Sequence, residues 1–158
     1  MTLFRQRFDA ELLRRRLSPL LDDPGWERGR QGTGYRRLDL RARRDVPSVE
    51  ALADALSIVA PPRADFHDAW LLAYDVGDFI APHRDPPLGE GLGHFRLNVL
   101  VEAGEGGELS LDGEPVTLAP GDAVLFRPDE VVHAVSPVLR GRRLVWSIGT
   151  NRPVSTPT

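Results

Sequence analysis

The residues of this sequence best suited to chemistry are two histidines and an aspartate. His83 and Asp85 lie two positions apart, and His133 follows much later in the chain. Two neutral imidazoles and one carboxylate form the three-ligand set that suits Fe(II) and leaves its other coordination positions open. Ten residues after His133 stands Arg143, whose planar guanidinium matches the geometry of a carboxylate. Together these residues predict a metal centre that binds O₂ and a carboxylate-bearing co-substrate such as 2-oxoglutarate.

Simpler explanations exist for each of these residues. A His-x-Asp pair occurs by chance in many proteins, and a zinc hydrolase could use the same three ligands. The other histidines, His67 and His94, are interpreted as ordinary core or surface groups. The sequence has no cysteine, which excludes thiolate zinc sites, cysteine nucleophiles and disulfides.

Strand periodicity indicates how these side chains can meet. Alternate residues of a strand face the same side, so His83 and Asp85 can bind one ion if a strand carries both. The same alternation places Arg96 and Asn98 on one face of their segment, where we expect them to line the pocket. Register in the last strand decides whether Arg143 or its neighbour Arg142 points inward.

The rest of the chain predicts elements that would support such a site. Apolar spacing of three and four over residues 8–21 predicts an amphipathic helix, and Ser48 is a suitable N-cap for a second. A short strand is expected near residues 35–40. After residue 64, short apolar segments recur between turn signals, which is typical of an all-β barrel or sandwich. Asp112-Gly113 predicts a tight hairpin. The strands expected there are 69–74, 95–102, 108–111, 115–118, 123–126, 134–138 and 143–148.

Composition limits the class of protein. The chain has 158 residues, 41% of them hydrophobic, which fits one globular domain. We expect a single domain over 1–158, with N-terminal helices over about 1–62 and a barrel over about 63–150. No apolar run reaches the roughly 20 residues of a membrane span, and no signal peptide is evident, so a cytoplasmic protein without a membrane partner is expected. A net charge of −3 offers no basic field for nucleic acid.

Four segments carry motifs that occur in a recognisable order. They are Tyr74–Asp85 (Tyr-x-x-Gly…His-x-Asp), Gly106–Leu109 (Gly-Gly-Glu), Pro120–Phe126 (Pro-Gly-Asp-x-Val-x-Phe) and His133–Arg143 (His-x-Val-x-Pro-Val-x-x-Gly-x-Arg). Together they resemble the prolyl-hydroxylase-like 2-oxoglutarate/Fe(II) dioxygenases over roughly residues 69–149.

This resemblance implies a mainly β fold with flanking helices, a double-stranded β-helix of the jelly-roll or cupin-like kind. It implies that His83, Asp85 and His133 hold Fe(II), and that 2-oxoglutarate and O₂ are co-substrates. The Gly-x-Arg end of its last motif favours Arg143 over Arg142 as the residue that binds the far carboxylate of 2-oxoglutarate. Tyr74 stands where the family often places a hydroxyl near 2-oxoglutarate, and Arg96 or Asn98 is expected to touch 2-oxoglutarate or the substrate. Oxidative decarboxylation of 2-oxoglutarate would drive hydroxylation of a C–H bond in a small molecule, an amino acid or a peptide.

The sequence leaves several alternatives open. Desaturation or ring closure can start from the same chemistry as hydroxylation. A cupin-like metal enzyme could use the same ligands without 2-oxoglutarate, and a non-catalytic β-barrel could bind a small molecule or a protein. The primary substrate and the oligomeric state are not indicated by any motif.

Overall fold

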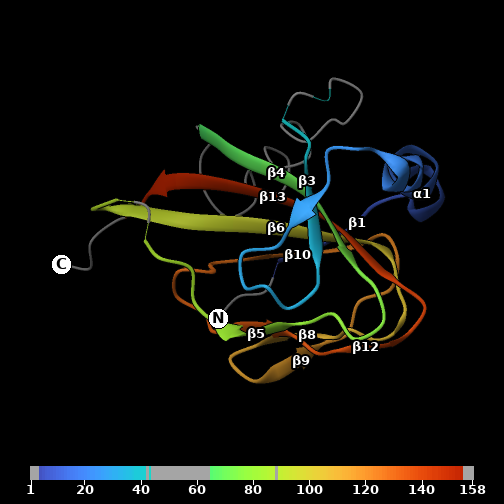
Figure 1. Ribbon diagram of the computed structural model, residues 1–158. Coiled ribbons are helices and arrows are strands. Elements are labelled where there is room, and N and C mark those ends of the chain that lie inside the picture. Colours follow the sequence, from blue (N-terminus) through green and yellow to red (C-terminus); the bar gives the residue numbers. More distant parts are fainter. Residues whose placement is uncertain (1–3, 42, 44–64, 88, 155–158) are drawn as a thin grey trace.

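Two facing sheets form the body of the molecule (Figure 1). The structure is a computed structural model that describes residues 4–41, 43, 65–87 and 89–154. The larger sheet has seven strands. In spatial order these are β1 (Phe4–Arg7), β10 (Asp122–Phe126), β6 (Leu92–Glu102), β13 (Arg143–Pro153), β4 (Asp65–Tyr74), β3 (Arg36–Asp39) and β2 (Glu27–Arg28).

A four-stranded sheet lies opposite the larger one. Its order is β5 (Ile80–His83), β11 (His133–Val135), β8 (Leu109–Leu111) and β9 (Glu114–Val116), and a separate pair joins β12 (Val138–Arg140) to β7 (Glu105–Gly106). Buried side chains of both sheets form one cluster, in which Leu100 and Val145 of the larger sheet join Leu109 and Val135 of the smaller. The mainly β, double-stranded β-helix fold is therefore confirmed, although the described strands form separate sheets and not a closed barrel.

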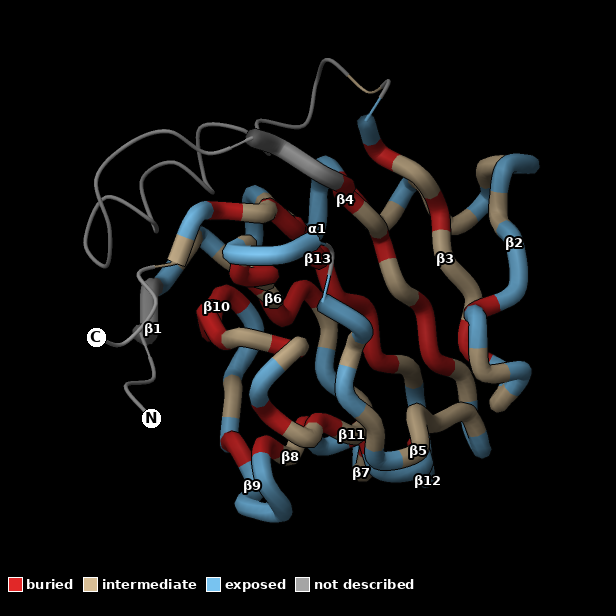
Figure 2. Tube along the Cα trace, turned by 90° about the vertical axis from the view of Figure 1, so that its left-hand side faces the viewer, coloured by how far each residue is buried: buried red, intermediate tan, exposed pale blue. Residues whose placement is uncertain are grey.

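The three central strands of the larger sheet have two contrasting faces. One face is apolar and belongs to a second buried cluster, to which β6 contributes Leu97 and Val99, and β13 contributes Leu144, Trp146 and Ile148. Because side chains alternate along a strand, the residues between these point toward the smaller sheet. The buried residues concentrate along these strands in Figure 2. The inner face is where charged and polar side chains gather.

Helical segments cover the apolar face. The predicted helix at 8–21 is observed as α1 (Ala10–Leu17) followed by the 3₁₀ helix η1 (Ser18–Asp22). The Asp9 side chain caps α1 by accepting a hydrogen bond from the backbone N–H of Leu12 at 3.0 Å. Leu17 is buried against the sheet, whereas Leu12 is exposed. The helix expected after Ser48 lies outside the described residues.

The N-terminal region also contributes strands. β1, β2 and β3 all come from the first 62 residues, where mainly helices were expected, and all three pair into the larger sheet. Of these, only the strand near residues 35–40 was predicted. The Asp112-Gly113 hairpin is confirmed, since β8 and β9 pair directly across it and both turn residues have positive φ, 50° and 84°. No described helix combines the length and apolar character that crossing a bilayer requires.

The packing of Trp146 gives a test of this arrangement. Its ring is buried and meets Phe8 edge to face at 5.9 Å between centroids. Truncation of a large buried aromatic leaves a cavity, so we expect Trp146→Ala to lower the free energy of unfolding by about 3–5 kcal/mol. Urea unfolding followed by circular dichroism would measure this. Leu139→Ala is the control, because Leu139 is 67% exposed and should change stability by about 0.5 kcal/mol or less. Equal effects of the two substitutions would contradict the packing described.

Candidate metal centre

Three potential metal ligands meet between the two sheets. One ligand atom from each of His83, Asp85 and His133 lies within 4.8 Å of the other two. Asp85 Oδ1 is 3.2 Å from His83 Nε2 and 3.7 Å from His133 Nε2, so a single carboxylate oxygen faces both imidazoles. The rings of the two histidines are 4.2 Å apart between centroids. Nitrogen and oxygen donors converging in this way suit a divalent transition metal.

Backbone pairing brings these residues together. In the smaller sheet, His133 of β11 is the direct cross-strand partner of His83 of β5. Strand β5 was not among the predicted strands, and it carries His83 but not Asp85, which lies two residues beyond its end. The N–H of Asp85 donates to the Pro128 carbonyl at 2.8 Å. The sheet therefore sets the two histidines, and a short anchored segment sets the aspartate.

Each imidazole has a backbone carbonyl oxygen beside its Nδ1, the nitrogen that does not face Asp85. His83 Nδ1 is 2.9 Å from the carbonyl oxygen of Ala81, and His133 Nδ1 is 3.2 Å from that of Val131. A carbonyl only accepts, so the contact with Val131 assigns the proton of His133 to Nδ1. Nδ1 of His83 lies beside a carbonyl and also beside the Gln31 amide nitrogen, at 3.0 Å, so these contacts hold its ring in place without fixing its tautomer. Such an outer partner fixes ring orientation in metal-binding histidines.

Electrostatics favours the neutral, metal-binding form of His133. Burial lowers the pKa of its imidazole, and the neighbouring His83 lowers it further. A neutral imidazole is the form that binds a metal, so His133 needs to lose no proton at neutral pH.

A cavity of about 300 Å³ opens over the three residues. Of the two candidate arginines, only Arg143 lines it. Arg143 is 5% exposed, lines the cavity, and has a buried Nε with no hydrogen-bond partner among the described residues. Arg142 does not line this cavity, and its side chain pairs with Asp75 at 3.2 Å. Burial lowers the pKa of Arg143, but a guanidinium remains charged in proteins. An unpaired, buried cation is suited to an anionic ligand.

Tyr74 forms the aromatic wall beside Arg143. The two residues are cross-strand partners, and the guanidinium carbon lies 5.9 Å from the ring centroid. Tyr35 stacks on the Tyr74 ring, with 5.4 Å between the ring centroids. Burial raises the pKa of Tyr74, so its hydroxyl stays protonated and can donate a hydrogen bond.

Arg96 and Asn98 both line the cavity, on the face that strand parity predicts. The guanidinium of Arg96 is already engaged: it makes two hydrogen bonds to Asp68, at 3.0 and 2.9 Å, and a third to Ser147 Oγ at 3.0 Å. Ser147 in turn donates to Asn98 Oδ1 at 2.7 Å. Asp68 therefore balances the charge of Arg96 inside the cavity.

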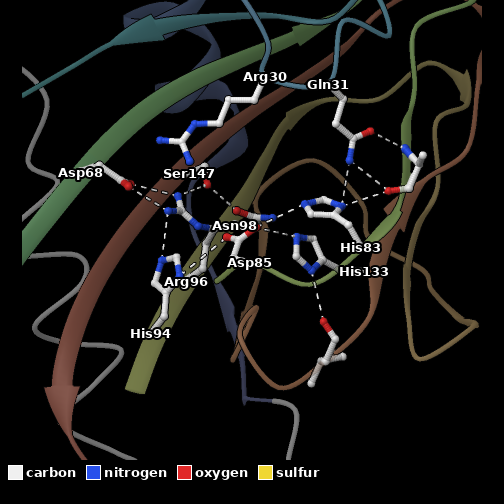
Figure 3. Close-up of polar contacts among 12 residues, drawn as sticks. Arg30, Gln31, Asp68, His83, Asp85, His94, Arg96, Asn98, His133 and Ser147 are labelled. Carbon is white, nitrogen blue, oxygen red and sulfur yellow. Dashed lines mark hydrogen bonds and ion pairs between the residues drawn. The ribbon is translucent and has the colours of Figure 1, made fainter. Parts of the chain in front are cut away.

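His94 is a cavity residue that the sequence interpretation missed. It is buried and lies against Asp85, with 3.6 Å between Nδ1 and Asp85 Oδ2 (Figure 3). The sequence did contain a signal, because His94, Arg96 and Asn98 alternate along β6 and must share a face. Burial, assisted by Arg96, lowers the pKa of His94 to about 4, so the ring is neutral at physiological pH. The side chain of His67 lies outside what the structure describes.

Gln31 is a second missed residue. Its side chain accepts from the Ala81 N–H at 2.7 Å and donates to the Ala81 carbonyl at 3.2 Å, which places it beside the His83 ring. The adjacent Arg30 extends over the cavity (Figure 3). Tyr35 holds this segment by accepting a hydrogen bond from the Arg30 N–H at 3.1 Å. Nothing in the sequence linked residues 30 and 31 to a site fifty positions away.

Comparisons with known proteins agree with this geometry. The model of the 2OG-Fe(II) oxygenase superfamily matches residues 69–148. A Pseudomonas putida prolyl-4-hydroxylase superposes with a TM-score of 0.71 at 19% identity, covering 97% of this chain and 93% of that one. A collagen prolyl hydroxylase of Paramecium Bursaria Chlorella virus-1, in complex with 2-oxoglutarate, gives 0.69 at 14%, covering 98% and 97%. HygX from Streptomyces hygroscopicus, with nickel and 2-oxoglutarate bound, gives 0.69 at 15%, covering 96% and 83%. No curated protein matches the chain.

The structural likenesses, at such low identity, show the shared fold. The family match extends over more than half of the chain and includes all three potential metal ligands and Arg143. The chain therefore belongs to the 2OG-Fe(II) oxygenase superfamily. It is a 2-oxoglutarate- and Fe(II)-dependent oxygenase, an oxidoreductase with Fe(II) as metal and with 2-oxoglutarate and O₂ as co-substrates. This sets aside the alternatives of a metal enzyme without 2-oxoglutarate and of a non-catalytic binding module.

Proposed function

We propose that this enzyme hydroxylates a C–H bond of a small-molecule, amino-acid or peptide substrate, with Fe(II) held by His83, Asp85 and His133. In the balanced reaction, one oxygen atom of O₂ enters the succinate formed from 2-oxoglutarate, CO₂ leaves, and the other oxygen atom becomes the hydroxyl of the product. Fe(II), when bound, supplies the activation of O₂. Asp85 carries the carboxylate ligand, which favours hydroxylation over reactions that need that ligand position open.

The observation that carries the proposal is the buried Arg143 at the end of the cavity that also holds the three ligands. Its Nε has no hydrogen-bond partner among the described residues, although an unpaired buried polar group is costly. A carboxylate of 2-oxoglutarate would supply that partner and balance the charge. Tyr74 and Asn98 line the same cavity, and the protonated hydroxyl of Tyr74 and the amide of Asn98 would orient the co-substrate there.

The charge at the cavity mouth supports an acidic substrate. Arg30 and Arg84 line the cavity and are both exposed, so they mark its mouth, and no ion pair joins either side chain to a described residue. Arg96, by contrast, is balanced by Asp68. Arg30 and Arg84 are therefore better placed than Arg96 to bind an anionic group of the substrate. We infer that the substrate presents a carboxylate or a similar anionic group to the mouth.

The ternary complex provides the first test. Anaerobic addition of Fe(II) and 2-oxoglutarate to the wild-type protein should give the weak visible metal-to-ligand charge-transfer band of chelated 2-oxoglutarate. His133→Ala removes one ligand and should abolish this band. A wild-type protein without the band, or a variant that keeps it, would refute the proposed ligand set.

The two neighbouring arginines form a matched pair for the co-substrate site. Arg143→Ala should weaken 2-oxoglutarate binding by one to two orders of magnitude, because it removes a charge-assisted pair and leaves the carboxylate buried without a partner. Arg142→Ala should change the affinity by less than about threefold, since an exposed pair with Asp75 contributes little. Titration of the charge-transfer band measures both. A larger loss in Arg142→Ala would reverse the assignment.

Substrate-dependent succinate release tests the substrate class. A panel of amino acids and short peptides should be compared with the same compounds carrying an amide in place of each carboxylate. We expect turnover with acidic members, and we expect Arg30→Ala to raise their KM about tenfold without a matching loss of kcat. Arg28→Ala is the control, because Arg28 is exposed on β2 and does not line the cavity. Equal KM values for the acids and the amides would contradict an anionic substrate.

A further inference from the structure

We infer that His94 is a positioning residue for Asp85, and that Arg96 and Asp68 hold it in the orientation required. The inference rests on the proposed function, because it assigns a role around a metal ligand. Its basis is a continuous line of contacts from Asp68 through Arg96 and His94 to Asp85 (Figure 3). None of these three supporting residues belongs to the proposed ligand set.

The donor and acceptor pattern fixes the His94 ring. Arg96 Nη2 lies 3.1 Å from His94 Nε2. A guanidinium has donors only, so Nε2 must be the acceptor and the ring carries its proton on Nδ1. That N–H faces Asp85 Oδ2 at 3.6 Å between nitrogen and oxygen, just beyond hydrogen-bond length, so a small movement of either side chain brings the donor onto the carboxylate. The ring thus presents a donor to the carboxylate, and the neighbouring guanidinium excludes the opposite tautomer.

The two oxygens of Asp85 are therefore distinguished. Oδ1 faces the Nε2 atoms of His83 and His133, whereas Oδ2 faces His94. A donor beside Oδ2 favours binding of a metal through Oδ1 alone and opposes rotation of the carboxylate. Outer partners of this kind raise metal affinity by orienting the ligand before the metal arrives.

Arg96 can act as a fixed donor because both an ion pair and the space around it hold its guanidinium in one position. Arg96, Gly149 and Asp68 lie in one row across β6, β13 and β4. The ion pair crosses above Gly149, where an added Cβ would stand 2.6 Å from Arg96 Nη2 and 2.9 Å from Asp68 Oδ1. The absence of a side chain at position 149 leaves the space in which the guanidinium lies.

Metal titration of paired variants tests the inference. Co(II), a spectroscopic substitute for Fe(II), is added to wild type, His94→Leu, His94→Asn and His94→Gln, and its d–d absorption gives the Kd. We expect His94→Leu to weaken binding 10- to 100-fold. The amide nitrogen of Asn falls at the place of Nδ1, so His94→Asn should recover an affinity within about threefold of wild type. The amide of Gln falls at the place of Nε2, so His94→Gln should not.

The outcomes separate this role from a purely structural one. An unchanged Kd in His94→Leu, or equal recovery by Asn and Gln, would overturn the inference. If His94→Leu does not unfold cooperatively in urea, the comparison of Asn with Gln decides alone. Asp68→Asn weakens the ion pair that holds Arg96 and should raise the Kd for Co(II) several-fold. An unchanged Kd in this variant would show that Asp68 has no part in positioning Asp85. Failure of wild type itself to bind Co(II) would instead refute the proposed function.

Discussion

The alternation of side chains along β4, β6 and β13 is the constraint on which the rest of the structure depends. Each strand carries apolar side chains on one face and cavity-lining side chains on the other. A shift of the strand register by one residue would exchange these two sets of side chains. On β13 the apolar set includes Trp146 and the cavity set includes Arg143 and Ser147. The same strand register therefore determines both the apolar face that the helices cover and the set of side chains that line the active site. A protein of 158 residues can in this way use the same strands for stability and for chemistry.

Strand pairing positions two of the three potential metal ligands, so a loop has to position only Asp85. His83 and His133 are opposite each other in a backbone ladder, so the hydrogen bonds that form the smaller sheet also bring their rings together. The larger sheet adds the residues proposed to bind the co-substrate, and the charged lining, from the other side. The site lies between the sheets because only there do side chains of both inner faces reach one point.

Much of this could be predicted from the sequence, and the limits have physical reasons. Period-two patterns located most strands after residue 64, and the spacing of His83, Asp85 and His133 indicated the site, because such signals are local. The row formed by Asp68, Arg96 and Gly149 depends on the register among three strands distant in sequence, which no local pattern encodes. His94 was overlooked because a lone histidine is usually an ordinary core group, although its parity with Arg96 was visible. The short strands β1 and β2 exist mainly through pairing with their neighbours.

The outer contacts of the three ligands differ in kind, and this has an evolutionary consequence. Both imidazoles are oriented by backbone carbonyls two residues earlier in the chain, at Ala81 and Val131. A carbonyl is present whichever amino acid occupies those positions, so this part of the site tolerates sequence drift. The carboxylate of Asp85 instead faces a side chain, His94, whose orientation depends on further side chains. Single substitutions can alter that half of the metal environment at several positions, whereas the histidine half has one side-chain contact of this kind, from Gln31 to His83. The aspartate half is therefore the more adjustable side of the centre.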